Sequence, residues 1–188
     1  MRKILSQSFF NRPALTVAKE LMGKYLVRRY RGKLVSAMIT EVEAYDGFKD
    51  KASHAFRGMT DRNKIMFGPA GFWYVYFTYG MHWMLNIVTG KKGYPAAILI
   101  RAVENINGPG KVTKNFYIDK KLNGKPATRE SGLWIEDKRV KIKNSEIKKD
   151  RRIGVAYAGP IWAKKKYRFS IISRKWFWWL PIPTKSEK

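Results

Sequence analysis

The 188-residue sequence has no cysteine, two histidines and only 14 acidic residues. The absence of cysteine excludes disulfides, cysteine nucleophiles and thiolate metal sites together. With histidine at positions 54 and 82 alone, the chain offers no conventional zinc site, and its scattered carboxylates do not suit a two-metal nuclease. We therefore expect neither a bound metal nor a cofactor.

Long apolar runs are also missing. No run approaches the roughly 20 residues of a membrane-spanning helix. The first residues, Met-Arg-Lys-Ile-Leu-Ser-Gln-Ser, are too few and too polar for a signal peptide. We expect an intracellular protein without a membrane partner, located in the cytoplasm or nucleoid if the source is a prokaryote. The length and apolar content suit one domain over residues 1–188 with a single core.

Positive charge, by contrast, is abundant. The sequence has 39 Lys+Arg against 14 Asp+Glu, a formal net charge of +25. Such a charge causes self-repulsion in the folded state, which a polyanionic partner would relieve. Nucleic acid is the first candidate partner and an anionic membrane surface the second. The alternative is a protein that is basic because its source has a lysine-rich proteome.

Residue patterns predict both helices and strands. Asn11, Pro13 and the apolar spacing predict a helix over 11–23, and a second helix is expected to begin near Pro109. A long loop, 47–71, has a length typical of functional segments, and the lysine-rich stretch 138–149 is expected to be a solvated connection. The predicted strands are Leu26–Tyr30, Leu34–Tyr45, Phe72–Thr78, Met81–Val88, Ala96–Val103, Trp134–Val140, Arg151–Gly159 and Tyr167–Ser173.

Two of these strands carry charged residues where apolar ones are the rule. Alternation along Leu34–Tyr45 places Glu41, Glu43 and Tyr45 on one face, which is either solvated or part of a site. Arg101 interrupts another apolar strand, so it requires a carboxylate or a bound ligand. One carboxylate that activates water, beside aromatic side chains that hold a flat substrate, suits cleavage of an N-glycosidic bond.

The strands Phe72–Thr78 and Met81–Val88 predict a hairpin with its corner at Tyr79-Gly80, where glycine can supply the positive φ of a two-residue turn. The tip residue is a large aromatic, and no acidic residue occurs between Arg62 and Val103. An aromatic tip in a basic stretch suits insertion into a nucleic-acid base stack. The alternative is a hairpin buried in the core of an α/β domain.

A series of motifs covers the chain from the first predicted helix onward. They are Thr40-Glu41-Val42-Glu43-Ala44-Tyr45, His54, Arg62-Asn63, Met66-Phe67, Tyr74-Val75-Tyr76-Phe77-Thr78-Tyr79-Gly80-Met81, Leu85-Asn86, Leu99-Ile100-Arg101-Ala102, Gly108-Pro109-Gly110-Lys111, Arg152-Ile153-Gly154-Val155, Tyr157-Ala158-Gly159 and Arg168-Phe169. In order and spacing they resemble the alkyladenine (3-methylpurine) DNA glycosylase family. The Glu-x-Glu-Ala-Tyr and Tyr-Val-Tyr-x-x-Tyr-Gly-Met segments are specific when they occur together.

The resemblance implies roles in catalysis. Glu43 matches the general base that activates the water attacking C1′, and Arg101 matches the arginine that helps to hold this water. Glu41 is not the base in the family, and an ion-pairing or structural role is expected for it. No lysine nucleophile matches the family pattern, so the expected product is an abasic site with an intact backbone.

The resemblance also implies roles toward the base and the DNA. Tyr45, His54 and Tyr76 match the pocket in which the flipped base stacks. Asn86 matches the residue that excludes the 2-amino group of normal guanine, and Tyr79 matches the intercalating tyrosine. The basic residues expected to contact the DNA backbone are Arg57, Arg62, Lys64, Lys91 and Lys92.

The fold that the resemblance implies is mixed α/β (α+β), a single compact domain with a curved, mainly antiparallel sheet, peripheral helices and a protruding hairpin. In that hairpin Trp73, Val75 and Phe77 are expected to face the core. The expected partner of the monomer is double-stranded DNA containing damaged purines such as 3-methyladenine, 7-methylguanine, hypoxanthine or ethenoadenine. We expect Trp176–Trp179 to cover the core and His82 to be structural.

Two other functions stay open. A catalytically silent damage-recognition or architectural DNA-binding protein would share the basic surface and Tyr79, but it would not need Glu43 and Arg101 together. A membrane-surface protein that binds through the C-terminal tryptophans is the other.

Overall fold

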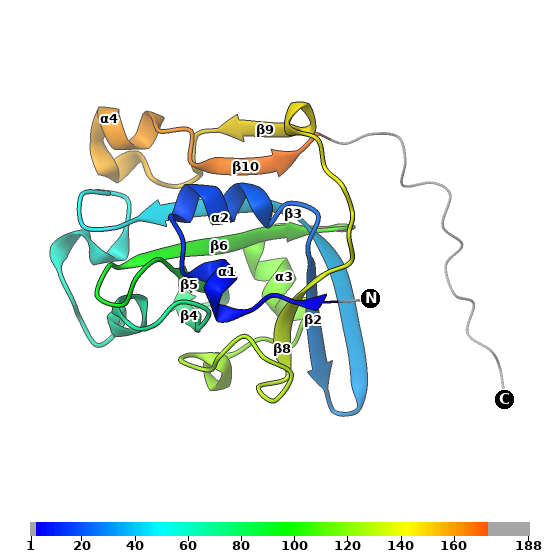
Figure 1. Cartoon of the computed structure of the whole chain (residues 1–188). Coiled ribbons are helices and arrows are strands. Elements are labelled where there is room, and N and C mark those ends of the chain that lie inside the picture. Colours follow the sequence, from blue (N-terminus) through cyan, green and yellow to red (C-terminus); the bar gives the residue numbers. More distant parts are fainter. Residues whose placement is uncertain (1–2, 173–188) are drawn as a thin grey trace, which may run out of the picture.

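An antiparallel sheet forms the centre of the molecule in the computed structural model, which describes residues 3–172 (Figure 1). Its main path is β1-β8-β2-β3-β6-β5-β4, while β7 pairs with β6, and β10 pairs with both β3 and β9. The strands are β1 (Lys3–Ile4), β2 (Tyr25–Tyr30), β3 (Lys33–Asp46), β4 (Trp73–Thr78), β5 (His82–Thr89), β6 (Ala96–Val103), β7 (Ile106–Asn107), β8 (Leu133–Asp137), β9 (Ile147–Asp150) and β10 (Arg168–Ile171).

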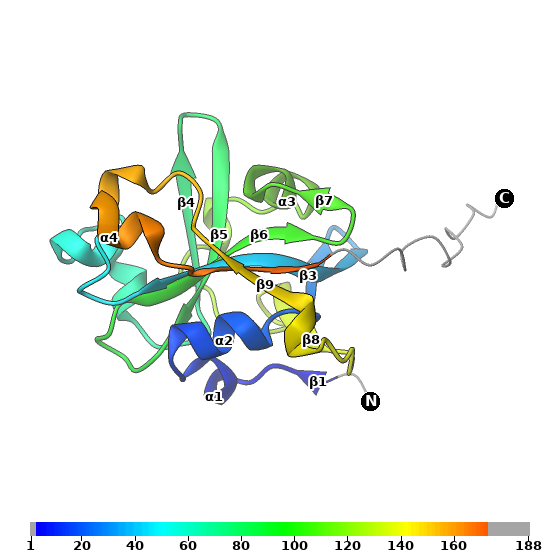
Figure 2. The ribbon, with the colours of Figure 1, turned by 90° about the horizontal axis from the view of Figure 1, so that it is seen from above.

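Short helices surround this sheet, so the expectation of a mixed α/β fold with an antiparallel sheet is confirmed. The α-helices are α1 (Gln7–Phe10), α2 (Ala14–Glu20), α3 (Pro109–Asn115) and α4 (Gly159–Lys164). Single 3₁₀ turns are η1 (His54–Arg57), η2 (Lys64–Phe67), η3 (Lys120–Leu122), η4 (Asn144–Glu146) and η5 (Ala156–Ala158). Seen from above, α1 and α2 lie on the side of the sheet opposite the β4–β5 hairpin (Figure 2).

Strand β3 is the long element on which the rest is built. Its first half pairs with β2, and its second half pairs with β6 on one side and β10 on the other. The register with β6 shifts on both sides of Glu41, an irregularity of the kind that re-aims side chains next to sites. Beyond it, Val42 and Ala44 point into the hydrophobic core, as the alternation predicts, and Glu43 points to the other face.

β4 and β5 form a hairpin at Tyr79-Gly80, where the sequence predicts a corner. β4 pairs with β5, and Met81 N–H donates to Thr78 O at 3.2 Å around a corner in which Tyr79 and Gly80 both have positive φ, +52° and +67°. Positive φ at both central positions is what a type I′ turn requires. Helix α3 supports the second strand, because the Thr113 hydroxyl donates to Trp83 O at 2.9 Å.

Several boundary predictions are wrong. The predicted helix over 11–23 is α2, which begins after Pro13, while Asn11 follows the unpredicted α1. The apolar face of α2, formed by Ala14, Val17 and Ala18, is nevertheless buried in the core. Strand β8 ends at Asp137, short of the predicted Val140. Phe77 is 44% exposed instead of facing the core, because the tip of the β4–β5 hairpin extends beyond the rest of the sheet (Figure 2).

The predicted strand Arg151–Gly159 is also wrong. Residues 151–155 are irregular and lead into η5 and α4, since Gly154 and Gly159 have φ of +75° and +79°, which an extended strand cannot contain. The strand of this region, β9, begins instead inside the lysine-rich stretch 138–149 that was expected to be a solvated connection, and it pairs with β10. The Trp176–Trp179 cluster lies outside the described residues.

Candidate active site

A cavity of about 800 Å³ opens between β3, the β4–β5 hairpin, β6 and the loops around 51–57 and 153–157. It collects most of the residues that the sequence predicted for the site. Those lining it are Glu43, Tyr45, His54, Arg57, Arg62, Tyr76, Tyr79, Asn86 and Arg101. Lys64, Lys91 and Lys92 do not line it: Lys64 pairs with Asp61, and the other two lie in the exposed turn after β5, at the opposite end of that strand from Tyr79.

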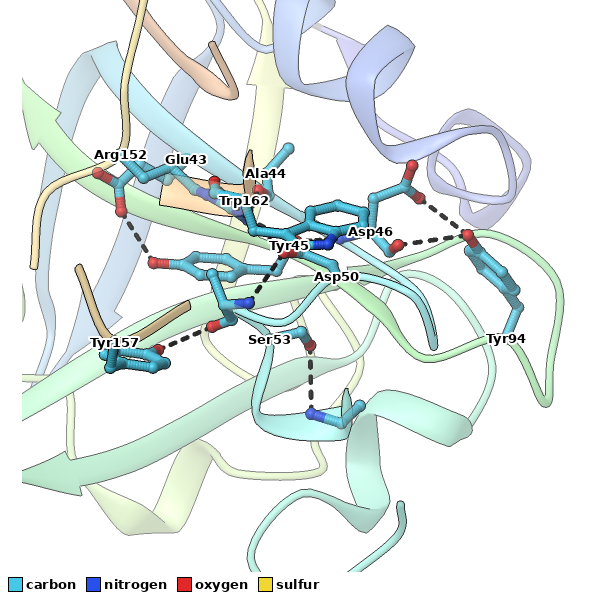
Figure 3. Close-up of polar contacts among 12 residues, drawn as sticks. Glu43, Ala44, Tyr45, Asp46, Asp50, Ser53, Tyr94, Arg152, Tyr157 and Trp162 are labelled. Atoms are coloured by element: carbon cyan, nitrogen blue, oxygen red, sulfur yellow. Dashed lines mark hydrogen bonds and ion pairs between the residues drawn. The ribbon is translucent and has the colours of Figure 1, made fainter. Parts of the chain in front are cut away.

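The carboxylate of Glu43 is fully buried, and each of its oxygens has partners, of which Figure 3 shows the Tyr45 hydroxyl. Oε1 accepts the Ile153 N–H at 2.7 Å, and Oε2 accepts the Tyr45 hydroxyl at 3.0 Å with Arg101 Nη1 at 3.4 Å. Burial raises the pKa of Glu43 above its usual value, against the lowering effect of Arg101 and of the two hydrogen bonds. The result is a carboxylate held in a fixed place with increased basicity.

Arg101 has the carboxylate partner that its position in an apolar strand requires, so this prediction is confirmed. Its Nε donates to Glu41 Oε1 at 3.0 Å, and both side chains are 14% exposed. Arg101 therefore lies between two glutamates of β3, of which Glu43 is the buried one.

Aromatic rings form the walls of the cavity above Glu43. The His54 ring lies 4.7 Å from the Tyr76 ring at 72°, and His54 Nδ1 is 3.0 Å from the hydroxyl of Tyr74. Burial and the nearby Arg62 lower the pKa of His54, and burial raises the pKa of Tyr76 to about 12. At neutral pH both walls are therefore uncharged and flat, which suits stacking with a planar base.

Two further side chains shape the cavity. Asn86 is buried and donates from Nδ2 to Tyr74 O at 3.1 Å, which fixes its amide at the wall. Arg62 donates from Nη2 to Phe77 O at 3.1 Å, and its guanidinium lies 5.1 Å from the centre of the Tyr76 ring. Arg62 is thus attached to the hairpin, although it comes from the loop.

A buried ion pair stands behind the wall formed by Tyr45 (Figure 3). Arg152 binds both carboxylate oxygens of Asp50, and its Nη1 also donates to Ala44 O at 2.9 Å. The guanidinium lies 4.8 Å from the Tyr45 ring, while Asp50 accepts the N–H of Ala52 at 3.0 Å. The pair connects the loop before His54 with the segment that supplies the Ile153 N–H.

The hairpin tip is exposed. The side chain of Tyr79 is 81% exposed and lies at the rim of the cavity, next to Met81, which is 66% exposed. The backbone of Tyr79 is left-handed, a conformation that costs a tyrosine about 1–2 kcal/mol and is typical of functional positions. His82 packs against Gly110, where a Cβ atom would approach the imidazole to 2.9 Å, so the hairpin needs glycine at that point of α3.

Comparison with known proteins identifies the family. The model of the methylpurine-DNA glycosylase family matches residues 8–107 and 104–175. The chain belongs to this family.

Curated relatives agree with this assignment. A protein of Methanocella arvoryzae is 43% identical over 88% of this chain and 91% of its own, and one of Carboxydothermus hydrogenoformans is 40% identical over 92% and 97%. A protein of Legionella pneumophila strain Paris is 43% identical over 91% and 95%. All three carry the printed name "Putative 3-methyladenine DNA glycosylase". The resemblance found in the sequence is confirmed.

Sequence reasoning missed several residues that line or support the cavity. Tyr74 lies two positions before Tyr76, so alternation along the strand contained the signal for it. Arg152, Ile153 and Tyr157 were assigned to a strand, whereas Tyr157 is 70% exposed at the cavity and donates from its hydroxyl to Ala52 O at 2.9 Å (Figure 3).

Over residues 3–172, no three His, Asp or Glu side chains come together in a way that could hold a metal ion. The helices of the same part of the chain include none with the length and apolarity needed to cross a membrane.

Proposed function

We propose that this protein is a monofunctional DNA glycosylase of base excision repair. It flips an alkylated or deaminated purine out of duplex DNA, hydrolyses the N-glycosidic bond with a water activated by Glu43, and leaves an abasic site. The observation that supports this most directly is a fully buried glutamate, held by hydrogen bonds to both oxygens, below uncharged aromatic walls in a chain of the methylpurine-DNA glycosylase family.

The chemical step needs one base and a positioned water. The carboxylate of Glu43 takes a proton from water while the water oxygen bonds to C1′ and the C1′–N bond breaks, so that the purine leaves with the bonding electrons. Negative charge beside C1′ stabilises the oxocarbenium-like transition state. Arg101, 3.4 Å from the carboxylate, lowers the pKa of Glu43 against the effect of burial and helps to hold the water.

The walls of the cavity suit flat substrates with a weakened glycosidic bond. A purine alkylated at N3 or N7 is cationic, so the faces of Tyr45 and Tyr76 attract it by about 0.5–2 kcal/mol. Such a base leaves as a neutral molecule, which makes protonation by the protein unnecessary. We propose 3-methyladenine and 7-methylguanine as substrates of this kind, with hypoxanthine and ethenoadenine as the neutral ones, and Asn86 as the residue that excludes guanine.

DNA binding in this proposal combines a wedge with phosphate contacts. A base within a duplex is inaccessible, so the exposed ring of Tyr79 enters the stack and fills the gap left by the flipped nucleotide. Arg57 and Arg62, at the cavity, are placed to contact the flanking phosphates, and Lys64, Lys91 and Lys92 remain predictions for the outer backbone. We propose that one molecule acts alone on each lesion.

The absence of lyase chemistry is also part of the proposal. Lys51 lines the cavity, but it is exposed, and its ammonium group lies 5.9 Å from the centre of the Phe56 ring. We expect no covalent adduct when the protein is treated with borohydride during turnover. A trapped protein–DNA adduct would contradict the monofunctional mechanism.

The test is release of the damaged base in single-turnover assays with a panel of lesion duplexes. Wild type should release bases and leave alkali-labile sites, while Glu43→Gln, which keeps the shape of the side chain, should release none. Glu20→Gln serves as a control, because Glu20 pairs with Arg12 on the surface. Tight binding of lesion duplexes by a wild type that releases no base would support the catalytically silent damage-recognition protein instead.

A further inference from the structure

Arg168 on β10 does not line the cavity, yet it lies directly opposite Glu43 in the sheet register. Its guanidinium serves three acceptors. Nη1 donates to Glu41 Oε1 at 3.2 Å, Nη2 lies 3.2 Å from Asp150 Oδ2, and Nε donates to Arg151 O at 2.8 Å. The side chain is 20% exposed, so these contacts are largely shielded from solvent.

The contact with Glu41 connects Arg168, through Arg101, to Oε2 of Glu43. The oxygen of Glu41 that accepts from Arg168 is the same Oε1 that accepts Arg101 Nε at 3.0 Å. Arg101 in turn lies 3.4 Å from Glu43 Oε2 through Nη1. Arg168 therefore fixes the carboxylate that fixes Arg101.

The contacts with Asp150 and Arg151 connect Arg168 to the segment that donates to Oε1 of Glu43. Asp150 Oδ1 accepts the Arg151 N–H at 2.8 Å, and Arg168 holds the carbonyl of Arg151. Two residues further along, the Ile153 N–H donates to Glu43 Oε1 at 2.7 Å. The side chain of Arg168 therefore links β9 and residues 151–153 to β10.

We propose that Arg168, with Glu41 as its intermediate, is a positioning residue that fixes the partners of both oxygens of the Glu43 carboxylate. This inference rests on the proposed function, because it assigns a role in the reaction at Glu43. Arginine is needed here, since the flat fork of a guanidinium can serve three acceptors in fixed directions and the point charge of a lysine cannot.

The test compares Arg168→Lys with Arg12→Lys. The two arginines are closely matched, because Arg12 also donates from Nε to a backbone carbonyl, Phe9 O at 2.8 Å, and from both Nη atoms to one carboxylate, Glu20. Arg168→Lys should lower the single-turnover rate of base release by about 10-fold to 100-fold, as expected for a displacement of about 1 Å in a catalytic group. Arg12→Lys should leave the rate unchanged.

Glu41→Gln gives a readout that a merely structural role would not move. A negative charge near a carboxyl raises its pKa, and Glu41 shares with Glu43 the Arg101 side chain that lowers the pKa of Glu43. Removing the charge of Glu41 should therefore shift the acid limb of the rate profile to lower pH while the plateau falls. The other groups that face Glu43 are unchanged in this variant; they are Arg101, Tyr45, Tyr76, Arg152 and Tyr157. The double variant Arg168→Lys/Glu41→Gln should lose less than the product of the two single losses, because both act through Arg101.

Binding of a duplex that carries a tetrahydrofuran abasic analogue separates positioning from DNA contact. We expect dissociation constants within about twofold of wild type for both variants. An unchanged rate in Arg168→Lys, a weakening of binding that matches the rate loss, or an acid limb unmoved in Glu41→Gln would each overturn the inference. If wild type releases the base and Glu43→Gln does not, the proposed function holds even when the role of Arg168 is refuted. If wild type releases no base, the proposed function itself is refuted.

Discussion

The buried ion pair between Asp50 and Arg152 allows a quantitative prediction. Both side chains are fully buried, and Asp50→Ala leaves the guanidinium of Arg152 without its counter-charge. Breaking a buried pair in this way costs about 3–5 kcal/mol, a large part of the roughly 5–15 kcal/mol that stabilises a typical protein. For a chain of this size, that loss corresponds to a fall in melting temperature of about 6–20 °C.

Calorimetry and urea denaturation measure this loss directly. The matched control is Glu20→Ala, which removes the partner of Arg12 from a pair whose side chains are 34% and 45% exposed. Exposed pairs contribute about 0–1 kcal/mol, so the control should lower the melting temperature by less than about 4 °C. Equal losses in Asp50→Ala and Glu20→Ala would refute the reasoning from burial.

A double replacement separates stability from catalysis. Asp50→Leu/Arg152→Met exchanges the pair for apolar side chains, a change that is often neutral or stabilising. Base release should nevertheless fall, because the loop before His54 and the segment carrying the Ile153 N–H lose their connection. A stable double variant with wild-type rates would show that the ion pair contributes to folding alone.

Changes of pH, of two side chains and of salt concentration also test the site. Burial raises the pKa of Glu43, so the rate of base release should fall as pH drops through a value above 4.5, the usual one for glutamate. The same shift means that protonation of Glu43 favours the folded state, and this contribution to stability is lost as pH rises from 4.5 through the folded-state pKa. In thermal melts, Glu43→Gln should therefore gain stability relative to wild type across that interval. A stability difference that does not change with pH would contradict the shift. Tyr79→Asn should keep or increase the melting temperature, because asparagine tolerates the left-handed backbone, yet it should lose base release from duplexes; full activity would exclude insertion. Binding to duplex DNA should weaken with a log–log salt slope of about −0.9 for each phosphate neutralised, and a slope near zero would exclude a phosphate-bound complex.

Local patterns in the sequence were enough to predict the hairpin and the alternation of β3. Tyr79-Gly80 sets the corner within two short apolar strands, and the 2-residue period decides which side chains leave the core. The requirement of Arg101 for a carboxylate also followed from elementary electrostatics. Its partners are the two glutamates that alternation had already placed on one face.

Other parts of the site depend on contacts between distant segments. Asp50 and Arg152 are 102 positions apart, and neither belongs to a regular pattern. The two lysines of β9 are exposed and give the strand no apolar pattern, so only its pairing with β10 reveals it as a strand. The segment after it turns at Gly154, so an apparent strand delivers a backbone N–H to Glu43 instead.

Several of the few acidic residues are gathered close to Glu43. Four of the 14 lie in an ion-pair network beside and behind the cavity, and each is paired with an arginine: Glu41 and Glu43 with Arg101, Asp50 with Arg152, and Asp150 with Arg168. Within it, burial raises the pKa of Glu43, while Arg101, Arg152 and the hydrogen bonds from Ile153 and Tyr45 act to lower it. The large positive excess is therefore carried outside this network, where it repels other parts of the same surface unless a polyanion covers it.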